Sequence, residues 1–107
     1  MAWTVDVKEA AIAHLRWFGK KTARQLLAKA LEILREDPLA DSRNLKTLRP
    51  NPIAGRELRL FGNYRVLFNV EAEGQSVTII LVGEKRGERL FVMGEEFSAH
   101  HESHSAE

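Results

Sequence analysis

The sequence predicts an α+β domain in which an N-terminal strand and a two-helix hairpin pack on an antiparallel β-sheet. Residues 20–36 carry apolar side chains at the i, i+3, i+4, i+7 spacing of a helix that buries one face. Three runs rich in β-branched and aromatic residues lie between residues 56 and 83, separated by two short glycine-containing turns, as in a meander. The chain has 107 residues, which is enough for one core. We therefore expect a single domain over residues 1–97.

The first third of the chain predicts one strand and two helices. Residues 3–7 alternate apolar and polar side chains, which indicates a short, half-buried strand. From Lys8 the spacing becomes helical, and Gly19 is expected to end this first helix. The second helix runs from about Lys20 to Glu36, where an Asp-Pro pair stops it. These two helices form the predicted hairpin.

The segments around the meander are less regular. Residues 37–55 contain three prolines and two polar clusters, so we expect a connector whose residues 45–48 dock leucines at the core edge. After the meander, the charged turn at residues 84–89 leads to a last short strand at residues 90–92. Residues 98–107 lack apolar periodicity and are predicted to form a disordered tail with acidic and histidine residues.

The two faces of the predicted sheet differ in character. Side chains alternate along a strand, so Leu58, Val66 and Phe68 share the face that the helices are expected to cover. Arg59 and Arg65 then lie on the opposite face, on neighbouring strands. The third run of the meander is apolar on both faces, which is typical of a central strand covered on both sides. We expect the function to reside on the arginine-bearing face.

The composition narrows the class of protein. The chain has no cysteine, which excludes disulfides and cysteine-based metal sites and fits a reducing cytoplasm. No apolar run approaches the roughly 20 residues that span a bilayer, and the first residues lack the layout of a signal peptide. We expect a soluble cytoplasmic protein that needs no metal or other cofactor and does not act at a membrane.

The formal net charge of +1 hides an uneven distribution. Basic residues outnumber acidic ones between residues 43 and 89, whereas residues 94–107 contain acidic residues and no lysine or arginine. A basic centre favours a phosphate-bearing or acidic partner, although an ordinary solvated surface also carries such a modest excess.

Four short motifs occur in a recognisable order. They are Leu45-Lys46-x-Leu48, Glu57-Leu58-Arg59, Gly62-x-Tyr64-Arg65-Val66-Leu67-Phe68, and Val82-Gly83-x-Lys85-Arg86 ending at Phe91. This set resembles the RelE/ParE toxin superfamily, and the leading strand and helical hairpin extend the resemblance over nearly the whole chain. The resemblance implies a RelE/ParE-like fold and the toxin of a type II toxin–antitoxin system. Such toxins are ribosome-dependent mRNA endonucleases (RelE-like) or poisons of DNA gyrase (ParE-like), held inactive by an antitoxin.

The resemblance also implies site residues. Arg65 matches the strand arginine of RelE-like nucleases, and either Lys85 or Arg86 matches the basic residue after the Val-Gly pair. The candidate catalytic residues are therefore Arg65, Lys85 and Arg86. The candidate RNA-binding residues are Lys46, Arg56, Arg59 and Phe91.

Cleavage of RNA by its own 2′-hydroxyl needs a proton acceptor, a proton donor and cations beside the phosphate. Arginine suits the last role because its planar fork donates two hydrogen bonds and keeps its charge. Many RelE-like nucleases have a tyrosine where this chain has Phe91, which offers no proton. The acid and base therefore remain open among Lys85, Glu57, Glu84 and a tail histidine. Arg65 could also form a purely structural ion pair with Glu57 or with the C-terminal acidic residues.

Three functions follow from the resemblance. The first is an mRNA endoribonuclease that acts in the ribosome and inhibits translation, with mRNA, the ribosome and a cognate antitoxin as partners. The second is a ParE-like poison of DNA gyrase, which needs no catalytic groups. The third is a protein with this fold that binds antitoxin but has little catalytic activity.

Overall fold

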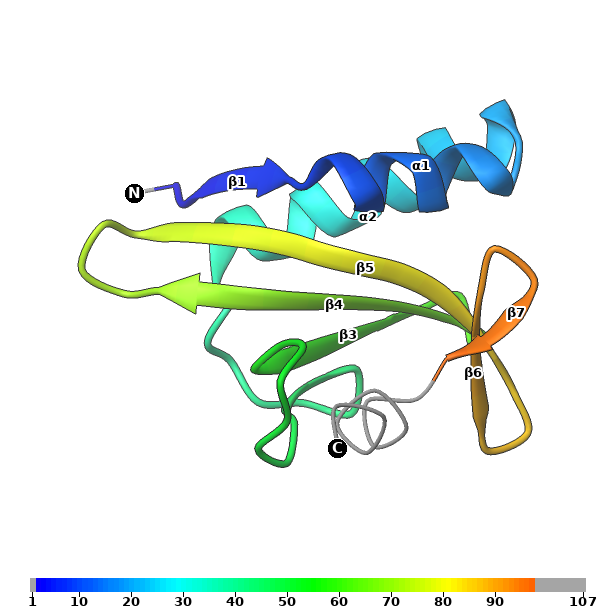
Figure 1. Cartoon of the computed structure of the whole chain (residues 1–107). Helices are drawn as coiled ribbons and strands as arrows, with labels where there is room; N and C mark the ends of the chain where they lie inside the picture. Colours follow the sequence, from blue (N-terminus) through cyan, green and yellow to red (C-terminus); the bar gives the residue numbers. More distant parts are fainter. Residues whose placement is uncertain (1, 98–107) are drawn as a thin grey trace.

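Two helices lie across one face of a seven-stranded sheet in the computed structural model, which describes residues 2–97 (Figure 1). This arrangement is the predicted α+β fold. In chain order the elements are β1 (Thr4–Val7), α1 (Glu9–Trp17), α2 (Lys20–Glu36), β2 (Leu45–Thr47), β3 (Arg56–Leu60), β4 (Tyr64–Glu71), β5 (Ser76–Arg86), β6 (Arg89–Val92) and β7 (Glu95–Phe97).

The helical hairpin forms where the sequence predicts it. Between α1 and α2, Gly19 has φ +92°, a backbone conformation that glycine adopts without the steric cost of a side chain. The helix α2 begins directly after it and ends before Asp37. Its buried residues, Leu26, Ala30 and Leu34, repeat at helical spacing and face the sheet.

The sheet has the strand order β2-β3-β4-β5-β6-β7, and each neighbouring pair is antiparallel. The first strand, β1, lies off this path and pairs with β5 in parallel, with Val7 opposite Ile79. A parallel pair requires a long crossover connection, which α1, α2 and the other strands provide. The sequence pattern predicted the strand β1 but not its partner.

The main core lies between the helices and the sheet face that carries Leu58, Val66 and Phe68, as predicted. These three side chains are at most 1% exposed. Burial of such large apolar side chains is the main source of stability for a domain of this size.

Two short strands were not predicted. Residues 45–47 of the connector form β2, because Leu45 is buried and pairs with Leu58 at the edge of the sheet. Residues 95–97 form β7, which pairs with β6 as a terminal hairpin that projects from one end of the sheet (Figure 1). Both strands have only three residues, which is too short for an alternating pattern to show.

A second apolar cluster covers part of the opposite sheet face. Its buried members are Ala54, Leu67 and Leu81, and Leu48, Leu90, Val92 and Phe97 pack against them. The strand β5 is therefore covered on both faces, in agreement with its apolar sequence. The connector and the β6–β7 hairpin provide this second cover, so they stand on either side of the open part of the face.

No helix within residues 2–97 is both long enough and apolar enough to cross a membrane. The predicted tail at residues 98–107 lies outside the described residues. The tail and the domain boundary at residue 97 therefore remain predictions.

Candidate functional site

The sheet face away from the helices collects charged side chains from three strands. On β3 and β4, Arg59 lies directly opposite Arg65, and Glu57 lies opposite Leu67. On β2, Lys46 lies opposite Glu57. Residues opposite one another in a ladder point to the same face, so the register alone brings these side chains together. The structure thus confirms that Arg59 and Arg65 share a face.

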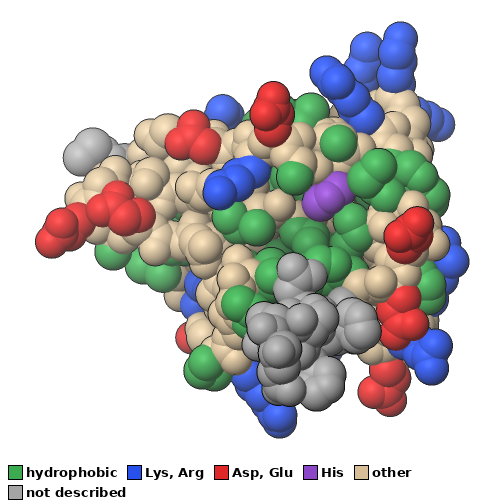
Figure 2. Space-filling model, viewed as in Figure 1, with side chains coloured by type: hydrophobic (Ala, Val, Ile, Leu, Met, Phe, Trp, Pro, Cys, Tyr) green, Lys and Arg blue, Asp and Glu red, His purple; other side chains and the backbone are tan. Residues whose placement is uncertain are grey.

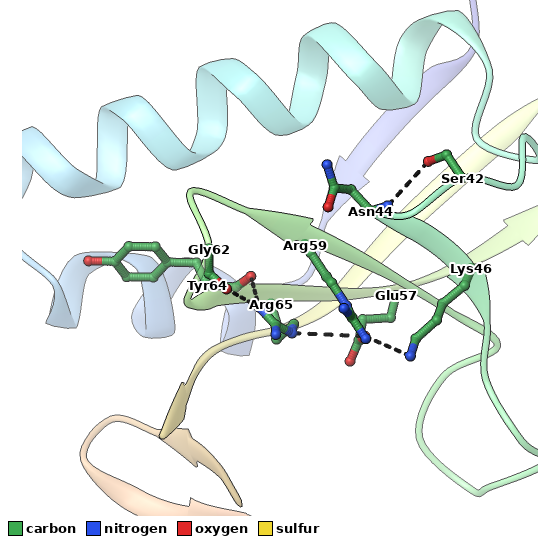
Figure 3. A network of polar contacts seen from close by, with 8 residues as sticks. All are labelled: Ser42, Asn44, Lys46, Glu57, Arg59, Gly62, Tyr64 and Arg65. Atoms are coloured by element: carbon green, nitrogen blue, oxygen red, sulfur yellow. Dashed lines mark hydrogen bonds and ion pairs between the residues drawn. The ribbon is translucent and has the colours of Figure 1, made fainter. Parts of the chain in front are cut away.

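Glu57 is the centre of this group, which we call the Glu57 cluster (Lys46, Glu57, Arg59 and Arg65). One carboxylate oxygen of Glu57, Oε1, lies 3.6 Å from Nε of Arg59, 3.9 Å from Nε of Arg65 and 3.9 Å from Nζ of Lys46. Figure 3 shows the three basic side chains converging on the carboxylate. Three cations around one anion leave the cluster with an excess of positive charge.

Arg65 is held rigidly within the cluster. Its Nη1 donates hydrogen bonds to the carbonyl oxygens of Gly62, at 2.9 Å, and Tyr64, at 3.0 Å. Burial lowers the pKa of Arg65, Glu57 partly opposes that effect, and the nearby charge of Arg59 adds to it. Arginine has so high an intrinsic pKa that the side chain stays charged. Arg65 is therefore a fixed, partly desolvated cation.

Two donors in the cluster are left without a hydrogen bond. Nε of Arg59 and Nε of Arg65 are both buried and have no partner within residues 2–97. Their distances to Glu57 are those of ion pairs and exceed normal hydrogen-bond lengths. Buried polar groups in proteins are usually satisfied, so these two N–H groups are balanced mainly by the charge of Glu57. Nε of Arg56, on the other face of the sheet, is likewise buried and without a partner within residues 2–97.

A groove of about 600 Å³ adjoins the Glu57 cluster. Glu57, Leu67 and Lys85 contribute to its lining. One wall is the connector at residues 48–52, and the other is formed by the β6–β7 hairpin and the turn before it, through Glu88, Arg89, Leu90, Glu96 and Phe97. The groove thus reaches Glu57 and Lys85 directly, whereas Arg59 and Arg65 are not lining residues and adjoin it through Glu57.

The connector wall is shaped by Asn51, a residue that the sequence analysis did not select. Its side-chain oxygen accepts hydrogen bonds from the backbone N–H groups of Ile53 and Ala54, at 2.8 and 3.0 Å. Its amide nitrogen donates to the carbonyls of Arg49 and Ala54, at 2.7 and 2.9 Å. The Pro-Asn-Pro sequence signals a turn of this kind, but not that the turn borders a groove.

Arg56 was predicted to bind RNA, but it lies on the other face of the sheet. It is two residues before Leu58 and pairs with Phe68, so its side chain emerges on the helix-covered side. Its guanidinium donates to Thr47 Oγ1 at 2.9 Å, to Asp41 Oδ1 at 3.2 Å and to the carbonyl of Ala40. These contacts fasten the connector to β3, and the structure does not place Arg56 in the Glu57 cluster.

Arg86 and Phe91 are also separated from the groove. Glu84 pairs with Phe91 and Lys85 with Leu90, so Arg86 and Phe91 share the ladder face opposite that of Lys85. The Arg86 guanidinium lies 4.7 Å from the centre of the Phe91 ring, and its Nη2 lies 3.4 Å from Glu84. Lys85 and Arg86 were the two candidates for the basic residue that follows the Val-Gly pair in RelE-like nucleases. Of these two, Lys85 lies on the groove side.

The groups able to transfer protons can also be placed. Glu57 and Lys85 line the groove, whereas Glu84 faces the other way with Arg86. The single tyrosine, Tyr64, points away from the Glu57 cluster (Figure 3) and packs edge-on against Phe18. The tail histidines lie outside the described residues. Within residues 2–97 there is no group of three or more potential metal-binding side chains.

Comparison with known proteins identifies relatives by structure. No family model matches the chain, and no curated protein is significantly similar in sequence. Among solved structures, a chain of the intact RelBE toxin–antitoxin complex of E. coli is 30% identical, with a TM-score of 0.60, covering 79% of this chain and 99% of that one. The isolated E. coli RelE toxin is 26% identical, with a TM-score of 0.60, covering 98% and 97%. A chain of the RelBE2 toxin–antitoxin complex from Mycobacterium tuberculosis is 25% identical, with a TM-score of 0.68, covering 79% and 100%.

Proposed function

Because the chain belongs to the RelE-like toxin superfamily, we propose that it is the toxin of a type II toxin–antitoxin system and cleaves mRNA as an endoribonuclease. The observation that carries this proposal is the Glu57 cluster at the side of a groove that also exposes Lys85. Fixed cations beside a carboxylate supply the charges that RNA cleavage requires, without a metal ion.

The proposed reaction is attack of an RNA 2′-hydroxyl on the adjacent phosphate. Glu57 accepts the 2′-hydroxyl proton as the 2′-oxygen–phosphorus bond forms. The bond from phosphorus to the 5′-oxygen of the next nucleotide breaks, and Lys85 gives that oxygen its proton. The products are a 2′,3′-cyclic phosphate and a free 5′-hydroxyl.

The basic members of the cluster have different proposed roles. Arg65 stabilises the negative charge that grows on the phosphate, since its fixed guanidinium needs little reorganisation during the reaction. Arg59 and Lys46 are more exposed than Arg65 and bind flanking phosphates. Arg56, Arg86 and Phe91 have no part in the proposed site because they lie on other faces.

We further propose that the substrate is mRNA in the ribosome and that cleavage inhibits translation in the cytoplasm. The excess positive charge of the cluster supports an RNA substrate. A groove of about 600 Å³ accommodates few nucleotides, so the wider surface of the ribosome would supply most of the binding energy and orient the strand.

A cognate antitoxin is the second proposed partner. Structural neighbours of this chain were solved as toxin–antitoxin complexes. The positive charge of the Glu57 cluster and the open groove beside it favour an acidic segment that folds on binding and covers the site. Such a segment would inhibit by occupying the position proposed for the mRNA phosphates.

One observation favours the gyrase-poison alternative. Where many RelE-like nucleases have a tyrosine, this chain has Phe91, and its single tyrosine packs on Phe18, away from the Glu57 cluster. A poison that acts by protein binding needs no proton donor, so it would function without a tyrosine in the Glu57 cluster.

The test is cleavage of a reporter mRNA by the purified protein in a translation extract that contains ribosomes. We expect fragments with 2′,3′-cyclic phosphate ends from the wild type and very little cleavage from Glu57→Gln, which keeps the shape but cannot accept the proton. Arg24→Ala is the matched control, because Arg24 is an exposed cation on α2, on the other side of the sheet. Intact mRNA together with gyrase-dependent DNA breaks would instead support the second candidate.

A further inference from the structure

The strand β5 changes its partner along one edge. On the edge away from β4, β1 pairs with Ser76–Ile79 and β6 pairs with Glu84–Arg86. Residues 80–83 lie between these two ladders, and within residues 2–97 no strand pairs with them on that edge. This gap separates the part of β5 that supports the core from the part that reaches the groove.

The strand β5 also bends at this gap. Phe68 on β4 pairs with Ile79, whereas the preceding Leu67 pairs with Leu81, so Ile80 is an extra residue without a partner in the ladder. An extra residue of this kind forms a β-bulge, which bends the strand and increases its twist.

A side chain from α1 closes the gap. The backbone N–H of Val82 donates a hydrogen bond to Nδ1 of His14, at 3.2 Å. His14 is half-buried. It is the only histidine within residues 2–97, so it is the purple side chain in Figure 2, where hydrophobic side chains lie around it. Val82 is only 1% exposed, so its N–H would lack an acceptor without His14. An Nδ1 atom can accept only when the imidazole is neutral and carries its proton on Nε2.

The part of β5 beyond the gap builds the groove. Lys85 lies three residues after Val82 and lines the groove, and β6 and β7 form one of its walls. The backbones of β5 and β6 approach closely here, since a Cβ atom added to Gly83 would lie 2.7 Å from the carbonyl oxygen of Phe91. A shift of β5 at Val82 would therefore be passed on to Lys85 and to the β6–β7 wall.

We propose that His14 is a positioning residue for the groove: the neutral imidazole fixes the bend of β5 at Val82 and so places Lys85 and the β6–β7 hairpin. Protonated His14 presents a donor to the Val82 N–H, breaks the hydrogen bond and releases this end of β5. The catalytic consequence rests on the proposed function, whereas the structural link between α1 and β5 does not.

Burial determines which protonation state of His14 prevails at neutral pH. It lowers the pKa of His14, so the neutral, accepting form prevails at neutral pH and is lost in acid. Charged residues on α1, α2 and β5, the elements packed together here, do not contribute to this shift. They are Glu9 and Arg16 on α1, Lys20, Lys21, Arg24, Lys29, Glu32, Arg35 and Glu36 on α2, and Glu84, Lys85 and Arg86 on β5.

Two variants separate the hydrogen bond from the titration. In His14→Asn, the Oδ1 atom can replace Nδ1 as the acceptor but does not titrate, so we expect near wild-type mRNA cleavage at pH 7.5. For the wild type we expect cleavage to fall below about pH 6.5, and this fall should be missing from His14→Asn. In His14→Leu the acceptor is gone, so cleavage should be reduced at every pH. Equal pH profiles for the wild type and His14→Asn would contradict the proposal.

Nuclear magnetic resonance tests the link without any assay of activity. At pH 7.5 the ring-nitrogen shifts of wild-type His14 should show a proton on Nε2 and none on Nδ1. The Val82 amide should exchange with solvent about tenfold faster in His14→Leu than in the wild type, with β6 amides also affected. A proton on Nδ1, or unchanged exchange at Val82, would overturn the proposal. If the wild type cleaves no mRNA, the proposed function fails and these spectra still decide the role of His14.

Discussion

Arg56 and Arg65 are both 8% exposed and lie on neighbouring strands, yet the two residues are built into the fold differently. The guanidinium of Arg56 donates to Asp41 and to the connector backbone. The guanidinium of Arg65 is anchored by two carbonyls, and its Nε faces Glu57 at 3.9 Å without a hydrogen bond. Burial alone therefore does not distinguish a structural arginine from a candidate functional one. The partners of the two arginines distinguish them. Within residues 2–97, Arg56 is the one cation paired with Asp41, whereas Arg65 shares the carboxylate of Glu57 with Arg59 and Lys46.

The comparison of Arg56 with Arg65 requires that the helix-covered face of the sheet is the core. A substitution of Phe68, which lies on that face, tests this requirement. Phe68 is fully buried opposite Arg56, so Phe68→Ala should lower the free energy of unfolding by about 3–5 kcal/mol. Urea unfolding followed by circular dichroism measures this loss. A loss below about 1 kcal/mol would mean that this strand has the opposite phase.

The second prediction concerns Arg65. In the proposed mechanism its cation acts mainly in the transition state, so Arg65→Ala should reduce the cleavage rate by about 10²–10³-fold. Arg65→Lys should restore only part of the rate, because a point charge replaces a planar fork. Single-turnover cleavage of ribosome-bound mRNA measures both. A folded Arg65→Ala protein that cleaves at the wild-type rate would remove Arg65 from the site.

The third prediction concerns Arg56, as the matched counterpart. Arg56→Ala leaves the Ala40 carbonyl and the Asp41 carboxylate without their donor, and it should cost about 1–3 kcal/mol of unfolding free energy. Cleavage per folded molecule should remain near the wild-type rate, since Arg56 lies on the face of the sheet opposite the Glu57 cluster. If Arg56→Ala instead abolished cleavage with unchanged stability, the two arginines would have to exchange roles.

Much of this contrast was accessible from the sequence. Alternation along the strands placed Arg59 and Arg65 on one face and Leu58, Val66 and Phe68 on the other, because a two-residue period needs no knowledge of neighbouring strands. The same alternation, extended back to residue 56, puts Arg56 on the Leu58 face. The prediction that Arg56 binds RNA followed the family resemblance and not this period, and the structure places Arg56 on the helix-covered face.

Other features could not be derived from the sequence. The pairing of β1 with β5 joins residues about 70 positions apart, and no local pattern encodes such a contact. The choice of Lys85 over Arg86 depends on the register with β6, which follows a bulge that shifts the ladder. The link between His14 and Val82 is likewise visible only once α1 has been docked on β5.

The smallest expected effect is the dependence of stability on pH, and it contrasts the half-buried His14, which titrates in this range, with the buried Arg65, which does not. Burial lowers the pKa of His14 in the folded state, so the unfolded chain binds a proton more readily. The contribution of His14 to stability is therefore full above its unfolded pKa of about 6.5 and is lost as the pH falls from there through the folded pKa. Arg65, whose pKa is also lowered by burial, remains charged throughout this range and adds no such slope. The difference in unfolding free energy between the wild type and His14→Asn, measured by urea unfolding from pH 8 to pH 5, isolates the contribution of His14. The wild type should lose stability relative to the variant on acidification, and a difference that is constant or of opposite sign would show that His14 is not held neutral in the fold.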